Sequence, residues 1–286
     1  MPKYLITGKN GMLAYALRIH PRFEDHVAFS HNEMEIGNYL ECYERIAKVR
    51  PEIVINSAAF TDVANAEFDS ETAFLTNAEG PRNLADICKK LGIKLVHFST
   101  DYVFPGRKSG NYTEYDETLP VNRYGSSKLE GEKLVKQESE DALIIRVSLM
   151  YGENGHNFVS TISRYLLKRE EVNVVADQFS KTTWTMDAAL ATHNLIQREA
   201  SGIFHFANDG VCSRFEFTKE IARLLQQSGK KVAVVRPISV AAYDDSTPRP
   251  TNSSMNTAKY KNFTKAEIQP WQHSLAEYME SAGLLE

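Results

Sequence analysis

Five short apolar runs that alternate with helical stretches restrict the fold of this chain more than any other feature. The runs are "KYLIT", "HVAFS", "EIVINSAA", "KLVHFST" and "ALIIRVS". Such runs are typical of strands buried on both faces of a parallel sheet. The stretches over 38–50 and 66–91 have helical periodicity and end at Pro51 and Gly92. Right-handed crossovers then predict an α/β fold, a doubly wound parallel sheet of the Rossmann type.

The second half of the sequence is less regular. We expect residues 1–150 to form a dinucleotide-binding domain and residues 151–286 a smaller, mainly substrate-binding part. The runs "EVNVVADQ" and "GIFHFAN" flank a helical stretch over 187–198, so residues 172–208 are predicted to return strands and a helix to the main sheet. The segment 244–257, "DDSTPRPTNSSMNT", has few apolar residues and predicts a surface loop near a binding cleft.

Composition excludes several classes of function. A net charge of -4 with 24% charged residues offers no basic excess for nucleic acid or an anionic membrane. No apolar run approaches the ~18 residues of a membrane span, and the first residues lack the order of a signal peptide, so we expect a cytoplasmic protein. The three scattered cysteines suggest reduced thiols, and the eight histidines show no metal-ligand spacing, so no metal site is expected.

A glycine turn follows the first predicted strand. In "TGKNGMLA", Gly8 and Gly11 lead directly into a helix, and Ala14 stands where a third glycine is usual. Glycines there let the N–H groups of a helix N-terminus approach a pyrophosphate. Two glycines alone are also typical of a plain turn, but the β-α-β context favours a dinucleotide.

The residues after the second strand bear on which dinucleotide binds. An NAD site usually has an acidic residue there, whereas this sequence has Phe29, Ser30, His31 and Asn32. Without a carboxylate to repel a 2′-phosphate, and with two side chains that could donate to one, the sequence favours NADP over NAD. A solvated turn is the other interpretation of the same residues.

Two more stretches fall at the carboxyl ends of predicted strands, where ligands bind in open α/β sheets. In "NSAAF", the small residues Ser57, Ala58 and Ala59 would let a flat cofactor pass close to the backbone. In "STDYVF", Thr100 and Asp101 would face the same crevice as the glycine turn. Both stretches therefore predict a cofactor and substrate site at one edge of the sheet.

The run "YGSSK" places Tyr124 one helical turn before Lys128. A phenol has an ordinary pKa of ~10, and an ammonium about 4 Å away favours the phenolate by up to roughly 4 kcal/mol. Tyr124 could then protonate a carbonyl oxygen as hydride reaches its carbon, with Thr100 bonded to the same oxygen. A helix-start aromatic, a surface lysine and a strand-end threonine are the alternative interpretations.

Together these motifs resemble the extended short-chain dehydrogenase/reductase family. The stretches "FPG", "KLEGEK", "RVSLMYG", "HNF", "VVADQ", "GIFHFAN" and "RPTNSSMNT" resemble in particular the dTDP-4-dehydrorhamnose reductase family, nearly end to end. The resemblance implies NAD(P)H-dependent reduction of the 4-keto group of a nucleotide-activated 6-deoxy sugar. It implies catalysis by Thr100, Tyr124 and Lys128.

The resemblance also implies the remaining site residues. Cofactor contacts are implied at Gly8, Asn10, Gly11, Met12, Leu13, Glu35, Ile36, Ala58, Ala59, Phe60, Tyr124 and Lys128. Substrate contacts are implied at Thr100, Asp101, Tyr102, Leu149 and Arg249. Arg249 resembles a position near the nucleotide diphosphate, where a guanidinium suits phosphate oxygens, but it is equally interpretable as a solvated loop residue. NADPH is the expected cofactor, NAD is possible, and a homodimer is implied. A magnesium role exists for some relatives, but the sequence has no ligand cluster for it.

Some positions depart from the family pattern. Leu149 replaces a tryptophan that packs on the sugar, Arg214 replaces a common aromatic, Thr182 and Thr183 replace a Pro-Thr pair, and Ala64 replaces an acidic residue. Loss of an aromatic platform changes selectivity by a few kcal/mol, so the exact sugar stays open.

Two other functions remain as alternatives. One is reduction, epimerisation or dehydration of another nucleotide keto sugar, for which Asp101 would be the acidic group. The other is a noncatalytic regulatory subunit resembling the partner of methionine adenosyltransferase. That alternative predicts a lost catalytic residue, and none is lost here.

Overall fold

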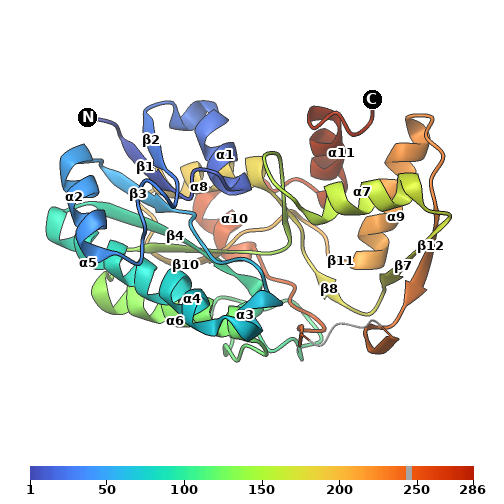
Figure 1. The fold of residues 1–286 in the computed structure, drawn as a ribbon, viewed down its shortest axis with the longest axis horizontal. Helices are drawn as coiled ribbons and strands as arrows, with labels where there is room; N and C mark the ends of the chain where they lie inside the picture. The colour runs from blue at the N-terminus through green and yellow to red at the C-terminus, as the bar shows by residue number, and fades with distance from the viewer. Residues whose placement is uncertain (243–246) are drawn as a thin grey trace.

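The main sheet has six parallel strands in the order β10-β5-β4-β3-β1-β2 (Figure 1). The computed structural model describes residues 1–242 and 247–286. The six strands are β1 (Tyr4–Thr7), β2 (His26–Phe29), β3 (Ile53–Asn56), β4 (Lys94–Thr100), β5 (Leu143–Val147) and β10 (Gly202–His205). The expected α/β fold with a parallel sheet is confirmed.

Helices cover both faces of this sheet. On one face lie α2 (Tyr39–Val49), α5 (Gly80–Leu91) and α6 (Arg123–Glu138), and on the other lie α1 (Met12–Ile19), α8 (Thr185–Ile196) and α10 (Ala258–Thr264). Neighbouring residues of β1 point to opposite cores, Leu5 toward Ile46 of α2 and Ile6 toward Leu17 of α1. Burial on both faces explains why the strands are continuous apolar runs.

Local signals set most helix ends. The Asn38 side chain accepts a hydrogen bond from the backbone of Glu41 at the start of α2, and α5 ends at Gly92, whose φ is 68°. The helical stretch expected over 66–91 is broken once, at Asp69, and is continuous from Ser70 to Leu91. Three shorter elements precede α5: α3 (Asn65–Phe68), α4 (Ser70–Phe74) and the π-helix η2 (Leu75–Glu79). Asp69 divides the first two because its side chain caps α4 through the Thr72 N–H.

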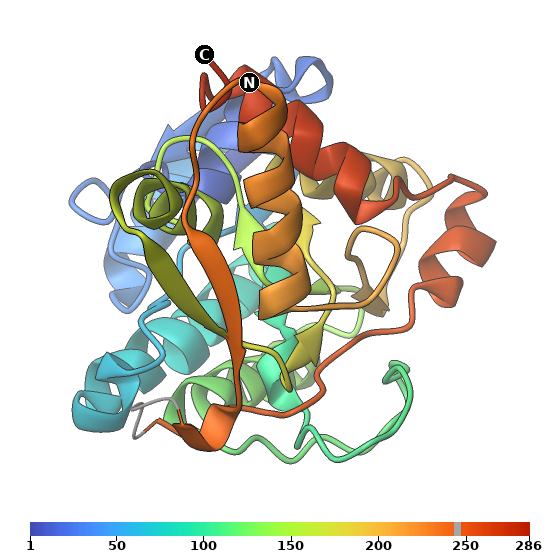
Figure 2. The ribbon, with the colours of Figure 1, turned by 90° about the vertical axis from the view of Figure 1, so that its right-hand side faces the viewer.

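The C-terminal part builds a second core (Figure 2). It contains α7 (Phe158–Lys168), β7 (Glu171–Val175), α9 (Arg214–Gln227), β12 (Val234–Ile238) and α11 (Trp271–Ser281). Of the segment 172–208, α8 and β10 return to the main sheet as expected, but β7 does not. It pairs in parallel with β12, because Val172 and Val174 are buried in the second core instead.

Short elements complete the chain. Two-residue strands form two further pairs, β6 (Met150–Tyr151) with β9 (Thr183–Trp184) and β8 (Phe179–Ser180) with β11 (Cys212–Ser213). Short turns of 3₁₀-helix are η1 (Pro21–Phe23), η3 (Asp101–Val103) and η4 (Val240–Ala242). The three cysteines are buried and free. Across residues 1–242 and 247–286, no helix has both the length and the apolar character needed to cross a bilayer.

Residues 252–256, here called the strap, cross the molecule between the two cores. Asp244 to Ser246 of the predicted surface loop lie outside the described residues. For the rest of that loop the surface expectation holds at Pro248 and Thr251, which are exposed, but is wrong at Ser253, Ser254 and Met255, which are buried. The strap is held by parallel bridges, one from Met255 to Tyr112 and one from Asn252 to Phe179, which satisfy its backbone groups away from water.

Candidate active site

The glycine turn after β1 is shaped to accept a phosphate. Gly8 has φ 70°, and a Cβ there would lie 2.9 Å from the backbone of Ala58, so only glycine fits. Gly11 donates to the Gly8 carbonyl at 2.8 Å and stands at the start of α1. No side chain caps that helix and its first turn has no acidic residue. The N–H groups of α1 therefore remain open toward an anion, which fits the pyrophosphate of a dinucleotide.

A row of polar side chains locks the strand ends beneath this turn. Thr7 donates to the Asn56 amide oxygen at 2.6 Å, and Asn56 lies 3.1 Å from His97 Nδ1. The Thr7 hydroxyl also accepts from the backbone N–H of Ala58 at 3.1 Å. Burial holds the pKa of His97 well below its usual value, so the ring is neutral. The carboxyl ends of β1 and β3 are thus fixed to each other and to the middle of β4.

Helix α6 carries the tyrosine and lysine to the same edge of the sheet. Asn122 caps the helix by accepting from the Gly125 N–H at 2.7 Å. A Cβ at Gly125 would lie 2.2 Å from the Tyr102 carbonyl, so this glycine lets α6 approach η3 closely. The rings of Tyr102 and Tyr124 meet edge to face, with centroids 5.9 Å apart.

Lys128 is buried at the floor of the cleft. Its side chain is 3% exposed, and its Nζ donates to the Phe98 carbonyl of β4 at 2.6 Å. Burial lowers the pKa of Lys128 to about 8, while Glu132 one turn further along α6 acts in the opposite direction. The Phe98 carbonyl accepts from only one of the three N–H groups of the ammonium, so the other two stay available to a ligand in the cleft.

Tyr124 does not have the lowered pKa that the sequence predicts. Burial raises the pKa of Tyr124 above its usual value, and hydrogen bonding to Thr100 only partly opposes this. The prediction fails because Lys128 directs its ammonium to Phe98. The phenol therefore keeps its proton near neutral pH, which is the state that a proton donor requires.

Asp101 is buried beside Thr100. The Thr100 hydroxyl donates to one oxygen of the Asp101 carboxyl at 3.2 Å, and the other oxygen accepts from Ser148 at 2.7 Å and from Ser253 of the strap. Burial raises the pKa of Asp101, and these hydroxyls oppose the rise. Sequence reasoning did not single out either serine, although Ser148 stands in "RVSLMYG" and Ser253 in "RPTNSSMNT", because their contact with Asp101 joins residues 47 and 152 positions apart.

Two neighbouring cavities open at this edge. The first is lined by residues of α1, α6 and the ends of β3, β4 and β5, including Leu13, Ser57, Ala58, Ala59, Thr100, Tyr124, Lys128 and Leu149. The second is lined by Asp101, Tyr102, Leu149, Gln178, Phe179, Ser180, Arg214, Pro250 and Ser253. The structure thus brings together the predicted catalytic residues in one cavity and three predicted substrate residues in the other.

Leu149 stands between the two cavities in a strained conformation. Its φ is 37°, in the left-handed region that a branched side chain disfavours. Thr183 holds the turn, donating its N–H to the Leu149 carbonyl at 3.2 Å. The backbone therefore fixes the direction of this side chain between the two cavities.

The other predicted cofactor residues differ in their surroundings. The Asn10 carbonyl accepts from Asn154 at 3.1 Å, and Met12 contacts the loop at Gly155. The Ile36 side chain is buried in the core against Gly80, and its carbonyl accepts from the Asn83 amide at 3.1 Å. The Glu35 carboxylate accepts from the Gly37 N–H at 2.9 Å.

Asn77 of the π-helix holds Phe60 in place. Its amide accepts from the Phe60 N–H at 2.9 Å, donates to the Phe60 carbonyl at 2.9 Å and donates to Ser127 of α6 at 3.0 Å. Gly131 lets α6 pack directly on this turn, since a Cβ there would lie 2.1 Å from the Asn77 carbonyl. Sequence reasoning missed Asn77, because a π-helix has no sequence pattern that distinguishes it from an α-helix.

A carboxylate does occupy the end of β2. The sequence interpretation found no acidic residue over 29–32, but Glu33 folds back so that its carboxylate accepts from the Ser30 N–H at 2.8 Å and hydroxyl at 2.7 Å. Lys9 of the glycine turn pairs with the same carboxylate at 3.3 Å. His31 pairs with Glu35. Residues 29–32 have no acidic side chain, as expected, but Glu33 brings a carboxylate next to Ser30 that the sequence interpretation did not consider.

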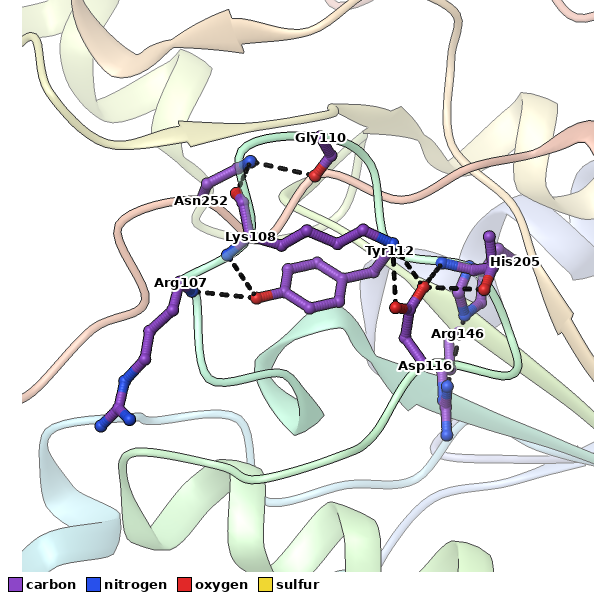
Figure 3. A network of polar contacts seen from close by, with 9 residues as sticks. Arg107, Lys108, Gly110, Tyr112, Asp116, Arg146, His205 and Asn252 are labelled. Carbon is purple, nitrogen blue, oxygen red and sulfur yellow. Dashed lines mark hydrogen bonds and ion pairs between the residues drawn. The ribbon is translucent and has the colours of Figure 1, made fainter.

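A network of polar contacts supports the strap (Figure 3). The Tyr112 hydroxyl accepts from the backbone N–H groups of Arg107 and Lys108 at 2.9 and 3.0 Å. Asn252 donates to the Lys108 carbonyl at 2.8 Å. These bonds fix the strap from which Ser253 reaches Asp101. Arg249, just before the strap, donates to the Tyr102 hydroxyl at 3.4 Å.

The described part of the chain contains no group of three or more His, Cys, Asp or Glu side chains placed to hold a metal ion.

The parallel sheet, the open helix N-terminus and the Thr-Tyr-Lys set at one edge define an extended short-chain dehydrogenase/reductase. Residues 2–283 match the model of the RmlD substrate binding domain family. A dTDP-4-dehydrorhamnose reductase of Burkholderia thailandensis is 34% identical and aligns over 96% of each chain. The spore coat polysaccharide biosynthesis protein SpsK of Bacillus subtilis is 34% identical over 98% of each chain.

A solved structure is equally similar. The dTDP-4-dehydrorhamnose reductase of Bacillus anthracis in complex with NADP has a TM-score of 0.92 and 34% identity, covering 98% of this chain and 99% of its own. The chain belongs to the RmlD substrate binding domain family, and these relatives confirm the resemblance to the dTDP-4-dehydrorhamnose reductases.

Proposed function

We propose that this protein reduces the 4-keto group of a nucleotide-activated 6-deoxy sugar with NADPH, with dTDP-4-dehydro-L-rhamnose the first candidate and dTDP-L-rhamnose its product. The observation that carries the proposal is that Thr100, Tyr124 and Lys128 line one cavity next to the uncapped N-terminus of α1. Relatives named dTDP-4-dehydrorhamnose reductase and the NADP complex support the substrate and the cofactor. Such a product would serve polysaccharide biosynthesis.

The bound cofactor supplies the hydride, and the chain positions the other groups. Thr100 donates to the carbonyl oxygen and turns from Asp101 to do so, since its hydroxyl has a single proton. Tyr124 delivers its proton to the oxygen as negative charge develops there. A phenol with a raised pKa is still far more acidic than the sugar alcohol formed, so the transfer is downhill.

Lys128 and the glycine turn hold the cofactor. The Lys128 ammonium, already bonded to Phe98, presents its remaining N–H groups to the cleft, where ribose hydroxyls would accept them. Gly8 and Gly11 bring the N–H groups of α1 to the pyrophosphate. The tight packing of Ala58 on Gly8 keeps this part of the cleft narrow enough for a flat ring system.

The test is reduction of dTDP-4-dehydro-L-rhamnose by the purified chain, followed through the loss of NADPH absorbance. General acid catalysis contributes about 10²–10⁴-fold, so Tyr124→Phe is expected to lower kcat by that factor. Lys133→Met, on the exposed side of the same helix, should leave kcat unchanged. Equal rates for the parent and Tyr124→Phe would contradict the proposal, and no oxidation with any keto sugar would favour the regulatory alternative.

A cytoplasmic location and a homodimeric state belong to the same proposal and rest on family resemblance. Light scattering coupled to size exclusion measures the oligomeric state, and a monomeric mass would remove the dimer from the proposal.

A further inference from the structure

Arg214 is a cation without a polar partner at the edge of the second cavity. It is the first residue of α9 and lines the cavity together with Asp101, Tyr102 and Gln178. Across the described residues, no hydrogen bond or ion pair involves its guanidinium. A half-buried guanidinium with five N–H donors is normally paired, and an unpaired one is costly.

The guanidinium is nevertheless held in place. Its Cζ lies 5.1 Å from the ring centroid of Phe158, and that ring stacks on Phe217 in the second core. Ser213 caps α9 just before it, through a reciprocal pair of bonds with Glu216. The charge is therefore preorganised by an aromatic platform and a capped helix, and little side-chain entropy remains to be lost on binding.

A second donor faces the same cavity without an acceptor. The Gln178 Nε2 atom is buried, and it has no hydrogen-bond partner in the described part of the chain. Arg214 also acts across the cavity on Asp101, whose pKa it lowers against the effect of burial. Two unsatisfied donors from different elements around one cavity indicate a ligand acceptor between them.

We infer that Arg214, with Gln178, binds a phosphate oxygen of the substrate's diphosphate. The inference rests on the proposed function. With the C4 carbonyl at Thr100 and Tyr124 in the first cavity, the C1–O–phosphate bond of a pyranose lies one ring away, in the neighbouring cavity that shares Leu149. A planar guanidinium fork suits phosphate oxygens.

The experiment measures binding of dTDP and dTMP by isothermal titration calorimetry to the full chain, with and without saturating NADP⁺. Arg214→Gln is expected to weaken dTDP binding about tenfold to a hundredfold, the loss of one charge-assisted contact, and to change dTMP binding less. Arg214→Phe, which introduces the aromatic expected from the family pattern, should lower the affinity for dTDP by the same factor. Arg214→Lys should lower that affinity less. Gln178→Leu should weaken dTDP binding several-fold.

The control is Arg223→Gln on the exposed side of α9, where the arginine pairs with Glu220, and dTDP binding should match the parent's. Binding of dTDP to Arg214→Gln within about twofold of the parent would overturn the inference. An unchanged dTDP affinity with a raised KM for the keto sugar would also overturn it, because the cation would then contact the sugar. If the parent binds dTDP through Arg214 but never oxidises NADPH, the inference stands and the proposed function fails.

Discussion

Replacing Arg146 by methionine removes the cation that neutralises a buried carboxylate. Arg146 of β5 makes two parallel bonds to Glu132 of α6, Nε to Oε1 at 2.8 Å and Nη2 to Oε2 at 2.6 Å. The two side chains are 3% and 2% exposed. Arg146 lies 3.3 Å from His205 (Figure 3). It also lies 5.1 Å from the Phe104 ring centroid. Breaking a buried pair costs about 3–5 kcal/mol, because the remaining charge has no partner.

Urea unfolding followed by circular dichroism measures this cost. We expect Arg146→Met to lower the free energy of unfolding by about 3–5 kcal/mol, and the double variant Arg146→Met/Glu132→Gln to recover part of that loss because no buried charge remains. Arg82→Met is the control, because that arginine makes only exposed ion pairs and should leave the unfolding midpoint nearly unchanged. A loss below about 1 kcal/mol for Arg146→Met, or a double variant no more stable than the single one, would refute the reasoning.

Three other perturbations test separate features. Gly131→Ala would place a methyl group 2.1 Å from the Asn77 carbonyl, so urea unfolding should show a free energy of unfolding lower by about 1–3 kcal/mol or more. Gly110→Ala is the control, because a methyl group there has nothing within 4 Å and should not lower the free energy of unfolding. Equal stabilities of the two variants would contradict this packing. Lys128 has a folded-state pKa of about 8, below its unfolded value, so the unfolded chain binds more protons above pH 8 and stability rises there. Urea unfolding at each pH should show that the free energy of unfolding of the parent rises by about 2 kcal/mol relative to that of Lys128→Met between pH 7.5 and 10. If the free energies of unfolding of the two proteins changed in parallel with pH, the amine would not be desolvated. Glu33→Gln frees Lys9 and removes a charge near a 2′-phosphate. Calorimetry should then show that adenosine 2′,5′-bisphosphate binds several-fold tighter, whereas the affinity for 5′-AMP is unchanged. An equal rise in affinity for both nucleotides would exclude a role of Glu33 at the 2′ position.

The sequence predicts those parts of the fold that local patterns determine. Continuous apolar strands, the Gly8 turn and the Pro51 and Gly92 helix ends follow from backbone geometry within a few residues, and all are confirmed. The motif order also placed Thr100, Tyr124 and Lys128 correctly at one edge of the sheet. These signals are local, so no knowledge of the tertiary structure was needed to read them.

What the sequence did not predict depends on distant contacts. Val172 and Val174 look like any buried strand, and only the second core determines that β7 pairs with β12. The polar composition of the strap predicts exposure, but Ser253 is buried because Asp101 accepts its hydroxyl. Likewise, the direction of the Tyr124 pKa follows from burial, which a spacing of four residues does not reveal.

The bond between Ser253 and Asp101 joins residues separated by 152 positions. A ribosome that has finished the first five strands of the sheet has therefore released Thr100, Tyr124 and Lys128 without the hydroxyl that secures their acidic neighbour. Competence for turnover arrives only when the segment from Ser253 onward emerges, so a prematurely terminated product would retain much of its nucleotide fold yet lack a finished pocket.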